Sequence, residues 1–397
     1  MLFAKLNDLS IGGKGSYGIA ASAVERKADL PTYLRITDIF DDGTLNLSEL
    51  KSVDAPNSDK YILKPNDIVF ARTGGSTGRN YFYDGSDGVF VYAGFLIKFS
   101  IDPEKVNPKY VKYYCRSKQY NEWVQSFNTG STRGNINAQT FGNMEIPLPE
   151  RKQQDYLVSI LEPIDEKIKN NKQVNDNLQQ QAAALFESWF VNYDPWDGVQ
   201  PSEWENAPLG SFVEIKRGGS PRPIQDFLSD SGLRWLKISD VTSLSSPFVL
   251  EIKEHIKEEG LRKTVFLHAG ELVLSNSATP GIPKILDVDT CIHDGWLYFP
   301  KSELSKYYLY LFFKHIRKEL VALGNGSVFT NLKTDILKAF PATKADESTL
   351  KEFDALVTPL FDAMLNADRE NFKLAAMRDA LLPKLMSSEI DVSEVEL

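Results

Sequence analysis

Two segments of the chain place apolar residues at alternating steps of four and three positions, which is the spacing of a coiled-coil seam. The first series runs from Leu157 to Trp189, and a second series follows at the same spacing from Phe353 to Leu385. Two amphipathic helices of equal length and matching phase are expected to pack on each other through these positions. The residues predicted to pair the helices are Leu157, Leu161, Ile164, Ile168, Asn175, Leu178, Leu185 and Trp189 in the first, and Val357, Leu360, Met364, Asn371, Leu374, Leu381 and Leu385 in the second.

Polar residues and prolines modify this helix prediction. Asparagine within a seam weakens the pairing but fixes its register, and Asn171, Asn175 and Asn371 occupy such positions. Pro163 and its counterpart Pro359 predict either a kink or a fresh helix start at the same place in both copies. A helix that starts after Pro163 and ends at Phe190 would be about 40 Å long at 1.5 Å per residue.

The remainder of the chain is a tandem repeat with a period of about 200 residues. The segment Leu34–Ile39 recurs as Leu236–Val241, and Asp67–Phe70 recurs as Glu271–Leu274. Their β-branched and aromatic residues predict short β-strands in both copies.

Further matches follow in the same order. Gly94-Phe95-Leu96 matches Gly295-Trp296-Leu297, and each copy then has a predicted helix, near Tyr110–Tyr114 and near Tyr307–Leu311. Each copy is therefore predicted to be a mixed domain of short strands, Gly-rich loops and a helix, and the fold class is α+β. The predicted boundaries are 1–147 and 201–345 for the two similar modules, and 148–200 and 346–397 for the two helical segments.

The order of domain, helix, domain, helix constrains the geometry. If the helices pair antiparallel, the two modules lie at opposite ends of a rod and the chain has an approximate two-fold axis, a relation that dimeric DNA-binding proteins obtain from two subunits. A separation of about 40 Å corresponds to about 12 base pairs of duplex DNA. A target split into two parts by an unread gap would follow.

The charge distribution along the chain is compatible with a nucleic-acid partner. A net charge of −9 and a pI near 5.2 argue against such a partner when taken over the whole chain. The four predicted segments, however, carry net charges of +1, −4, +1 and −7 in chain order, so the excess acid lies in the helical segments. The modules can therefore present local basic faces, although a mixed solvated surface would have the same composition.

The remaining composition indicates a folded cytoplasmic protein. Two cysteines are too few for a disulfide framework or a four-cysteine zinc site, and they favour a reducing compartment. The chain has neither a signal-peptide pattern at its start nor 18 consecutive apolar residues, so we expect no membrane association.

Catalytic motifs are weak or absent in the sequence. Gly13-x-Gly15-x-x-Gly18 matches a dinucleotide-binding pattern formally, but no helix is predicted after it. Gly74-Gly75-Ser76-Thr77-Gly78-Arg79 does not reach a Walker A ending, and Asn192-Tyr193-Asp194-Pro195 has the residues of a methyltransferase tetrad in the wrong order. The four histidines lack zinc-ligand spacing. We therefore expect no catalytic residue, cofactor or metal in this chain.

The segments best suited to DNA are loops that combine glycine with hydrogen-bond donors. Glycine lets the backbone approach phosphates closely, Ser and Thr donate to phosphate oxygens, and Arg and Asn can bridge base edges. The two modules agree in framework but differ in these side chains, as expected if they bind different half-sites, although divergent solvent loops would also differ. The predicted DNA-binding residues are Lys14, Tyr17, Arg72, Thr73, Ser76, Thr77, Arg79, Ser131, Thr132, Arg133 and Asn135 in the first module, and Lys216, Arg217, Ser220, Arg222, Asn276, Ser277, Thr279, Lys284, Ser327, Thr330 and Asn331 in the second.

The chain resembles the DNA specificity subunits of type I restriction-modification systems. The likeness is carried by Ile146-Pro147-Leu148-Pro149 before the first helix, by Leu185–Pro195 at its end and by Leu381–Ser387 at the end of the second. With the repeat, it covers essentially the whole chain. The second copy departs from the pattern, because Pro341 is followed by Ala342-Thr343-Lys344 without a second proline, which implies a differently built junction.

This resemblance implies a function for each part. The modules would be target recognition domains that bind the two parts of a split site in double-stranded DNA. The helices would dock two modification subunits, which bind S-adenosylmethionine and methylate adenine, and restriction subunits that use ATP would join the complex. The chain itself would be non-catalytic.

Two other classes stay open on the residues alone. A stand-alone enzyme is disfavoured by the missing motifs, and it would act on DNA as the purified chain. A coiled-coil scaffold that binds only protein is the alternative of a different class, and it predicts no sequence preference in a DNA-binding assay.

Overall fold

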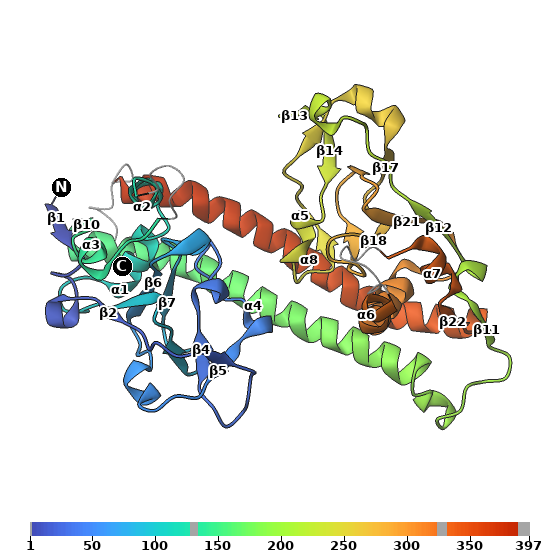
Figure 1. Ribbon diagram of the computed structural model, residues 1–397, viewed down its shortest axis with the longest axis horizontal. Helices are drawn as coiled ribbons and strands as arrows, with labels where there is room; N and C mark the ends of the chain where they lie inside the picture. The colour runs from blue at the N-terminus through green and yellow to red at the C-terminus, as the bar shows by residue number, and fades with distance from the viewer. Residues whose placement is uncertain (1, 128–133, 324–331, 388–397) are drawn as a thin grey trace. The chain divides into compact units, whose positions relative to one another are not determined.

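The computed structural model describes residues 2–127, 134–323 and 332–387, and it divides into two compact units (Figure 1). The first unit combines Met1–Asp165 with Ala375–Leu397, and the second comprises Glu166–Leu374. Each unit therefore holds one copy of the repeat together with parts of two long helices. These helices are α4 (Arg151–Phe190, green in Figure 1) and α8 (Glu347–Met386, red).

The first unit contains a two-stranded ribbon and two four-stranded sheets. The ribbon pairs β1 with β10 in antiparallel fashion, and the sheets have the orders β2-β9-β6-β7 and β3-β5-β4-β8. The strands are β1 (Leu2–Lys5), β2 (Ser16–Tyr17), β3 (Ala23–Val24), β4 (Thr32–Leu34), β5 (Lys51–Val53), β6 (Asp67–Ala71), β7 (Asn80–Tyr83), β8 (Phe90–Tyr92), β9 (Leu96–Ser100) and β10 (Glu145–Leu148). The shorter helices are α1 (Pro108–Tyr114), α2 (Lys118–Gln125) and α3 (Ala138–Gly142).

The second unit contains a similar ribbon, β11 with β22, and two five-stranded sheets. Their orders are β12-β21-β18-β19-β15 and β13-β16-β14-β20-β17. The strands are β11 (Glu205–Pro208), β12 (Val213–Arg217), β13 (Leu228–Ser229), β14 (Leu233–Leu236), β15 (Phe248–Val249), β16 (His255–Ile256), β17 (Val265–Leu267), β18 (Leu272–Ser275), β19 (Pro283–Leu286), β20 (Thr290–Ile292), β21 (Trp296–Ser302) and β22 (Pro341–Lys344). The shorter helices are α5 (Ser239–Thr242), α6 (Lys306–Leu323) and α7 (Thr334–Ala339).

The two units share one topology, which confirms the predicted repeat and the α+β class. The order β2-β9-β6-β7 corresponds to β12-β21-β18-β19, and β3-β5-β4-β8 corresponds to β13-β16-β14-β20, so the second unit differs by one added edge strand in each sheet. The parallel pair of β4 with β8 recurs as β14 with β20, and the added strand β15 also pairs with β19 in parallel. Helices are present where they were predicted, α1 over Tyr110–Tyr114 and α6 over Tyr307–Leu311.

The long helices pair antiparallel within each unit. In the second unit the Asn171 amide donates to the Asn371 side-chain oxygen at 2.9 Å, and Asn175 donates to Asp368 at 2.7 Å, so positions on α8 fall as positions on α4 rise. In the first unit Leu157 and Leu161 share one apolar core with Leu382. The predicted seam residues are all buried or partly buried.

Both prolines lie inside continuous helices, so the alternative of a fresh helix start is wrong. α4 begins at Arg151, before Pro163, and α8 begins at Glu347, before Pro359. A proline inside a helix removes one N–H donor and its ring crowds the carbonyl four residues earlier, and packing of the apolar face offsets this cost.

Three local predictions also differ from the structure. In Leu34–Ile39 the strand ends at Leu34, because the Asp38 carboxylate accepts hydrogen bonds from the backbone N–H and the side chain of Arg35 and stabilises a turn. In the second copy Asp240 accepts from the Lys237 N–H in the same way. The Gly94 match is displaced by one residue, as shown below. The junction after the second module is built like the first, because β22 pairs with β11 as β10 pairs with β1.

Candidate DNA interface

In the first unit the candidate interface forms where β6 ends and the chain turns away from the sheet. The Arg72 N–H donates to the Phe95 carbonyl at 3.1 Å, and the Arg72 carbonyl accepts from the Ile136 N–H at 2.9 Å. Thr73 pairs with Asn135 in an isolated β-bridge. Three predicted residues from distant parts of the sequence, Arg72, Thr73 and Asn135, therefore share one backbone frame.

The Arg72 guanidinium lies over the ring of Tyr17, 5.1 Å from its centroid. Tyr17 is 42% exposed, and its hydroxyl accepts a hydrogen bond from the Ala138 N–H at 3.1 Å. The Nε atom of Arg72 is buried and has no acceptor among the described residues. Phe95, whose carbonyl accepts from the Arg72 N–H, is 59% exposed, and the sequence prediction omitted it. An exposed aromatic residue next to a glycine was the signal that could have identified it.

 The loop after Arg72 leaves backbone open to a ligand. Gly74 has a φ of +77°, in the left-handed region that favours glycine, and begins a short turn. A Cβ atom added at Gly74 or at Gly75 would meet nothing within 4 Å. The Thr77 hydroxyl closes the turn by donating to the carbonyls of Gly74 and Gly134, at 2.8 and 2.9 Å. The N–H groups of Thr77 and Gly78 donate to carbonyls of the turn itself, whereas the open space beside Gly74 and Gly75 leaves room for a ligand to approach the backbone.

Other predicted residues of the first module are placed differently. Arg79 is engaged by Asp41, with its Nε atom 2.6 Å from the carboxylate, and Ser76 is buried. Lys14 is exposed in the loop before β2. Ser131, Thr132 and Arg133 lie outside the described residues.

In the second unit the corresponding loops gather around Asp294. Its carbonyl accepts from Nε of Arg217, and its carboxylate accepts from the Ser220 hydroxyl and, at 3.0 Å, from Arg222. The Ser220 hydroxyl and the two arginines hold the pKa of Asp294 below its ordinary value against the opposing effect of burial. Three predicted residues, Arg217, Ser220 and Arg222, are therefore brought together by an acid that the sequence prediction omitted.

The predicted residues after β18 are less accessible. Asn276 is only 2% exposed, and its side-chain oxygen has no donor among the described residues. Ser277 and Thr279 are partly buried in the turn that follows, where the Thr279 carbonyl accepts from the Ser275 hydroxyl at 2.6 Å. Ser327, Thr330 and Asn331 lie outside the described residues.

Lys284 is not available to DNA in this structure. The side chain is 3% exposed, and its ammonium donates to the carbonyls of Leu244 and Ser246. Burial lowers the pKa of Lys284 to about 7, and the nearby Lys314 acts in the same direction. Its position in β19, whose side chains are all buried, explains why a lysine chosen from loop composition lies in the interior. We leave it out of the interface.

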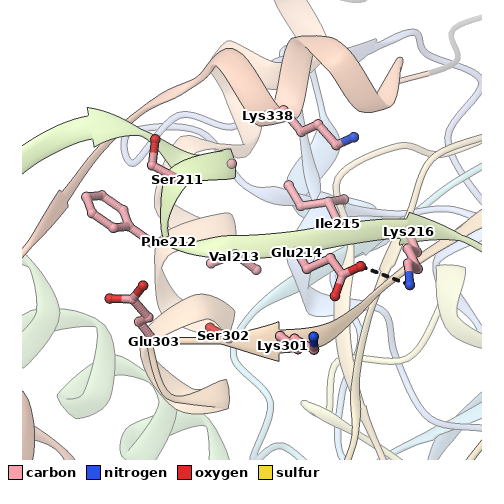
Figure 2. Close-up of a pocket in the computed structure, with 11 residues that line it drawn as sticks. Ser211, Phe212, Val213, Glu214, Ile215, Lys216, Lys301, Ser302, Glu303 and Lys338 are labelled. Atoms are coloured by element: carbon pink, nitrogen blue, oxygen red, sulfur yellow. Dashed lines mark ion pairs between the residues drawn. The ribbon is translucent and has the colours of Figure 1, made fainter.

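Lys216 borders an open groove of about 640 Å³ rather than the Asp294 cluster (Figure 2). Its ammonium forms an ion pair with Glu214 at 2.9 Å, as the dashed line in Figure 2 marks. Lys301 and Lys338 also line the groove, and Glu303 is the second acid in it. The mixture of lysines and carboxylates makes this groove a poor site for a phosphate.

Backbone hydrogen bonds define which positions of the two units are equivalent. The Gly18 N–H donates to the Leu96 carbonyl at 3.2 Å, and the Gly218 N–H donates to the Trp296 carbonyl at 2.9 Å. Leu96 therefore corresponds to Trp296, and not to Leu297 as the glycine match suggested. A Cβ atom on either glycine would lie 2.3 Å from a carbonyl oxygen of the facing strand, so both positions require glycine.

The same backbone hydrogen bonds show which candidate residues are equivalent in the two units. The Arg72 N–H donates to the Phe95 carbonyl, and the Asn276 N–H donates to the Gly295 carbonyl. Tyr17 faces Ile97 in its ladder, and Arg217 faces Leu297. Tyr17 thus corresponds to Arg217 and Arg72 to Asn276, so equivalent positions carry different chemistry.

Each unit also anchors its module to the long helices, and the two anchors differ. In the first unit the Asp165 carboxylate on α4 accepts from Arg116 at 2.7 Å and from Arg378 at 3.1 Å. In the second unit Phe361 on α8 stacks on Tyr307, with ring centroids 4.4 Å apart, and is 1% exposed. Arg378 falls on the predicted second seam series, whereas Asp165 and Phe361 lie beside the seams, and sequence periodicity alone did not identify those two.

Comparisons with known proteins identify the family. The model of the type I restriction modification DNA specificity domain matches residues 26–180 and 201–343. The chain is 24% identical to the type I restriction enzyme MjaIX specificity subunit of Methanocaldococcus jannaschii, over 74% of this chain and 72% of that protein. It is 23% identical to the HindI specificity subunit of Haemophilus influenzae, over 94% of this chain and 98% of that protein.

A solved structure has the same fold. The type I restriction-modification S subunit from M. genitalium aligns with a TM-score of 0.57 at 16% identity, over 97% of this chain and 95% of that one. In the described part of the chain, no helix is long and apolar enough to cross a membrane.

A repeated α+β module combined with paired long helices and divergent loop side chains defines a tandem-module DNA-binding protein. The chain belongs to the type I restriction modification DNA specificity domain family, and it is a specificity subunit of such a system.

Proposed function

We propose that this specificity subunit recognises a two-part target in double-stranded DNA, with one part bound by each module. One observation supports the proposal: the two modules share a pattern of backbone hydrogen bonds but carry different side chains at equivalent positions. Tyr17 and Arg72 in the first module correspond to Arg217 and Asn276 in the second. Sequence is read by side chains that reach base edges, so two modules with one frame and different side chains are suited to two different half-sites.

The open loop of the first module supports a DNA contact. The free space around Gly74 and Gly75 lets a phosphate approach the backbone N–H groups, and exposed Lys14 adds a positive charge in the same module. Phosphate contacts of this kind position a protein on the duplex, while the base contacts supply selectivity.

We further propose that the long helices dock two modification subunits, and that restriction subunits join the same complex. Exposed apolar side chains on both helices support a protein partner: Val174 on α4, and Leu356, Phe372 and Met377 on α8. A contiguous exposed apolar patch marks a protein interaction site, and these four residues are the positions on the helices that would contribute to one. In this proposal S-adenosylmethionine and ATP bind to the partner subunits, and this chain is non-catalytic.

Genome-wide mapping of methylated adenines tests this function. A host that expresses the modification subunit is compared with and without this chain. We expect methylation at a split motif only when the chain is present. Methylation without a motif, or none above the background of the host lacking the chain, would favour the scaffold alternative.

A second assay tests the proposed division of labour. The purified chain, incubated with DNA, S-adenosylmethionine and ATP, is expected to methylate and cleave nothing, and methylation is expected after the modification subunit is added. Product formed by the chain alone would support the stand-alone enzyme.

A further inference from the structure

In each module β9 or β21 lies between β2 or β12 and β6 or β18, and the corner formed by Tyr17 and Arg72, or by Arg217 and Asn276, holds one arginine at one of its two positions. In the first module the arginine is Arg72, which follows β6, and Tyr17 on β2 supports it. In the second module β12 supplies Arg217 at the position of Tyr17, and Asn276 takes the position of Arg72. The exchange keeps one guanidinium per module.

Neither guanidinium forms an ion pair within the described residues, whereas seven other arginines do. Arg35, Arg79, Arg116, Arg151, Arg222, Arg369 and Arg378 all form ion pairs with aspartate. Among the described residues, Arg72 and Arg217 have no carboxylate within ion-pair distance. Arg72 rests on an aromatic ring, and Arg217 donates through Nε to a backbone carbonyl. Each therefore retains N–H donors for another partner.

The different side chains at equivalent positions of the two modules favour a base contact over a phosphate contact. Phosphates are the same at every sequence, so two modules with one frame would be expected to keep a phosphate-binding cation at the same position. Tyr17 and Arg217, and likewise Arg72 and Asn276, instead differ in charge. Arginine reads guanine by donating two parallel hydrogen bonds to O6 and N7 in the major groove, the commonest specific contact in protein–DNA complexes.

We propose that Arg72 and Arg217 each read one guanine, in different halves of the target. This inference rests on the proposed function of the chain. Tyr17 is a positioning residue, because its ring holds the Arg72 guanidinium and restricts its rotation.

The test is conservative substitution followed by mapping of methylated adenines in cells that express the modification subunit. Lysine retains the charge but lacks the planar pair of donors, so Arg72→Lys and Arg217→Lys separate base reading from phosphate binding. We expect each variant to lose discrimination at one G·C pair, by about 5- to 150-fold, with the other half of the motif unchanged. Arg151→Lys on α4 and Arg369→Lys on α8, both at exposed positions of the long helices, are the matched controls and should leave the motif unchanged.

The outcomes separate this inference from the proposed function. If the wild-type chain produces no split motif, the proposed function fails. If the wild type produces one and both variants retain it at every position, the inference is overturned while the function stands. Uniformly weaker methylation with an unchanged motif would also overturn it, because that result marks a phosphate contact. Thermal unfolding of each variant at the wild-type temperature shows that an altered motif does not come from misfolding.

Discussion

Replacing Asp165 by asparagine is predicted to destabilise the first unit selectively. The carboxylate accepts hydrogen bonds from Arg116, Arg378 and the Tyr113 hydroxyl, and Lys112 lies 3.2 Å away. The side chain is 14% exposed, and the substitution leaves three cations around a neutral amide, of which Lys112 keeps Glu162 at 3.3 Å and Arg378 keeps Asp379 at 2.8 Å.

The magnitude follows from the cost of removing one partner of a buried ion pair, which is about 3–5 kcal/mol. Asparagine retains one oxygen that can accept a hydrogen bond, so we expect a loss near the lower end, about 3 kcal/mol. At a urea dependence of about 1–3 kcal/mol per molar, the unfolding midpoint of this unit should fall by roughly 1–3 M.

The destabilisation should depend on pH. Burial disfavours the ionised carboxylate, but Arg116, Lys112 and Arg378 outweigh it and hold the pKa of Asp165 below its ordinary value. A carboxyl group with a lowered folded pKa stabilises the fold above its unfolded pKa of about 3.9, and the stabilisation is lost as the pH falls toward the folded pKa. The difference between the wild type and Asp165→Asn is therefore expected to be full at neutral pH and to shrink below about pH 4.

Hydrogen exchange measured by mass spectrometry at increasing urea resolves the two units. Peptides from α1 should lose protection at lower urea in Asp165→Asn, while peptides from α6 should not change. Glu166→Gln, at the exposed neighbouring position, is the control and should match the wild type. Equal midpoints for Asp165→Asn and the wild type would refute the assigned role of this carboxylate.

Three further predictions test other parts of the account. Phe361→Ala is expected to cost about 3–5 kcal/mol in the second unit without the acid dependence of Asp165, as urea unfolding followed through α6 peptides should show. Gly18→Ala and Gly218→Ala should each lower the stability of their unit by about 1–3 kcal/mol, because the added Cβ lies 2.3 Å from a carbonyl oxygen. Gly75→Ala is the control, because open space surrounds that position, and its thermal unfolding should match that of the wild type. Burial lowers the pKa of Lys284 to about 7, so the unfolded chain binds more protons than the folded chain between about pH 7 and 10.5. The free energy of unfolding, compared with that of Lys284→Met, should therefore rise with pH in this range by up to about 1.4 kcal/mol per pH unit. A difference that does not change with pH would contradict the buried ammonium.

The repeat and the helix pair were predictable from sequence because each is a property of spacing. The seam from Leu157 to Trp189 follows from periodicity alone, and a repeat implies a shared topology wherever its two copies fold. Strand ends were less predictable. Asp38 ends a strand through a local hydrogen bond to Arg35, which competes with the ladder.

Features that depend on tertiary contacts could not be read from spacing. Lys284 resembles a loop cation in sequence, but its strand pairing places it in the interior. Asp294 was missed because its partners come from the distant segment 217–222. The match of Gly94 with Gly295 failed because it aligned the two glycines by residue type. The backbone hydrogen bonds of Leu96 and Trp296 show instead that these two residues are equivalent.

Exchange of a whole module tests most directly the central claim that each module specifies one part of the target. Residues 201–345 are replaced by the corresponding module of another family member, and methylated adenines are mapped in cells that express the modification subunit. We predict that one half of the split motif changes while the other half and the gap between them stay the same. A change in both halves, or in neither, would contradict the account.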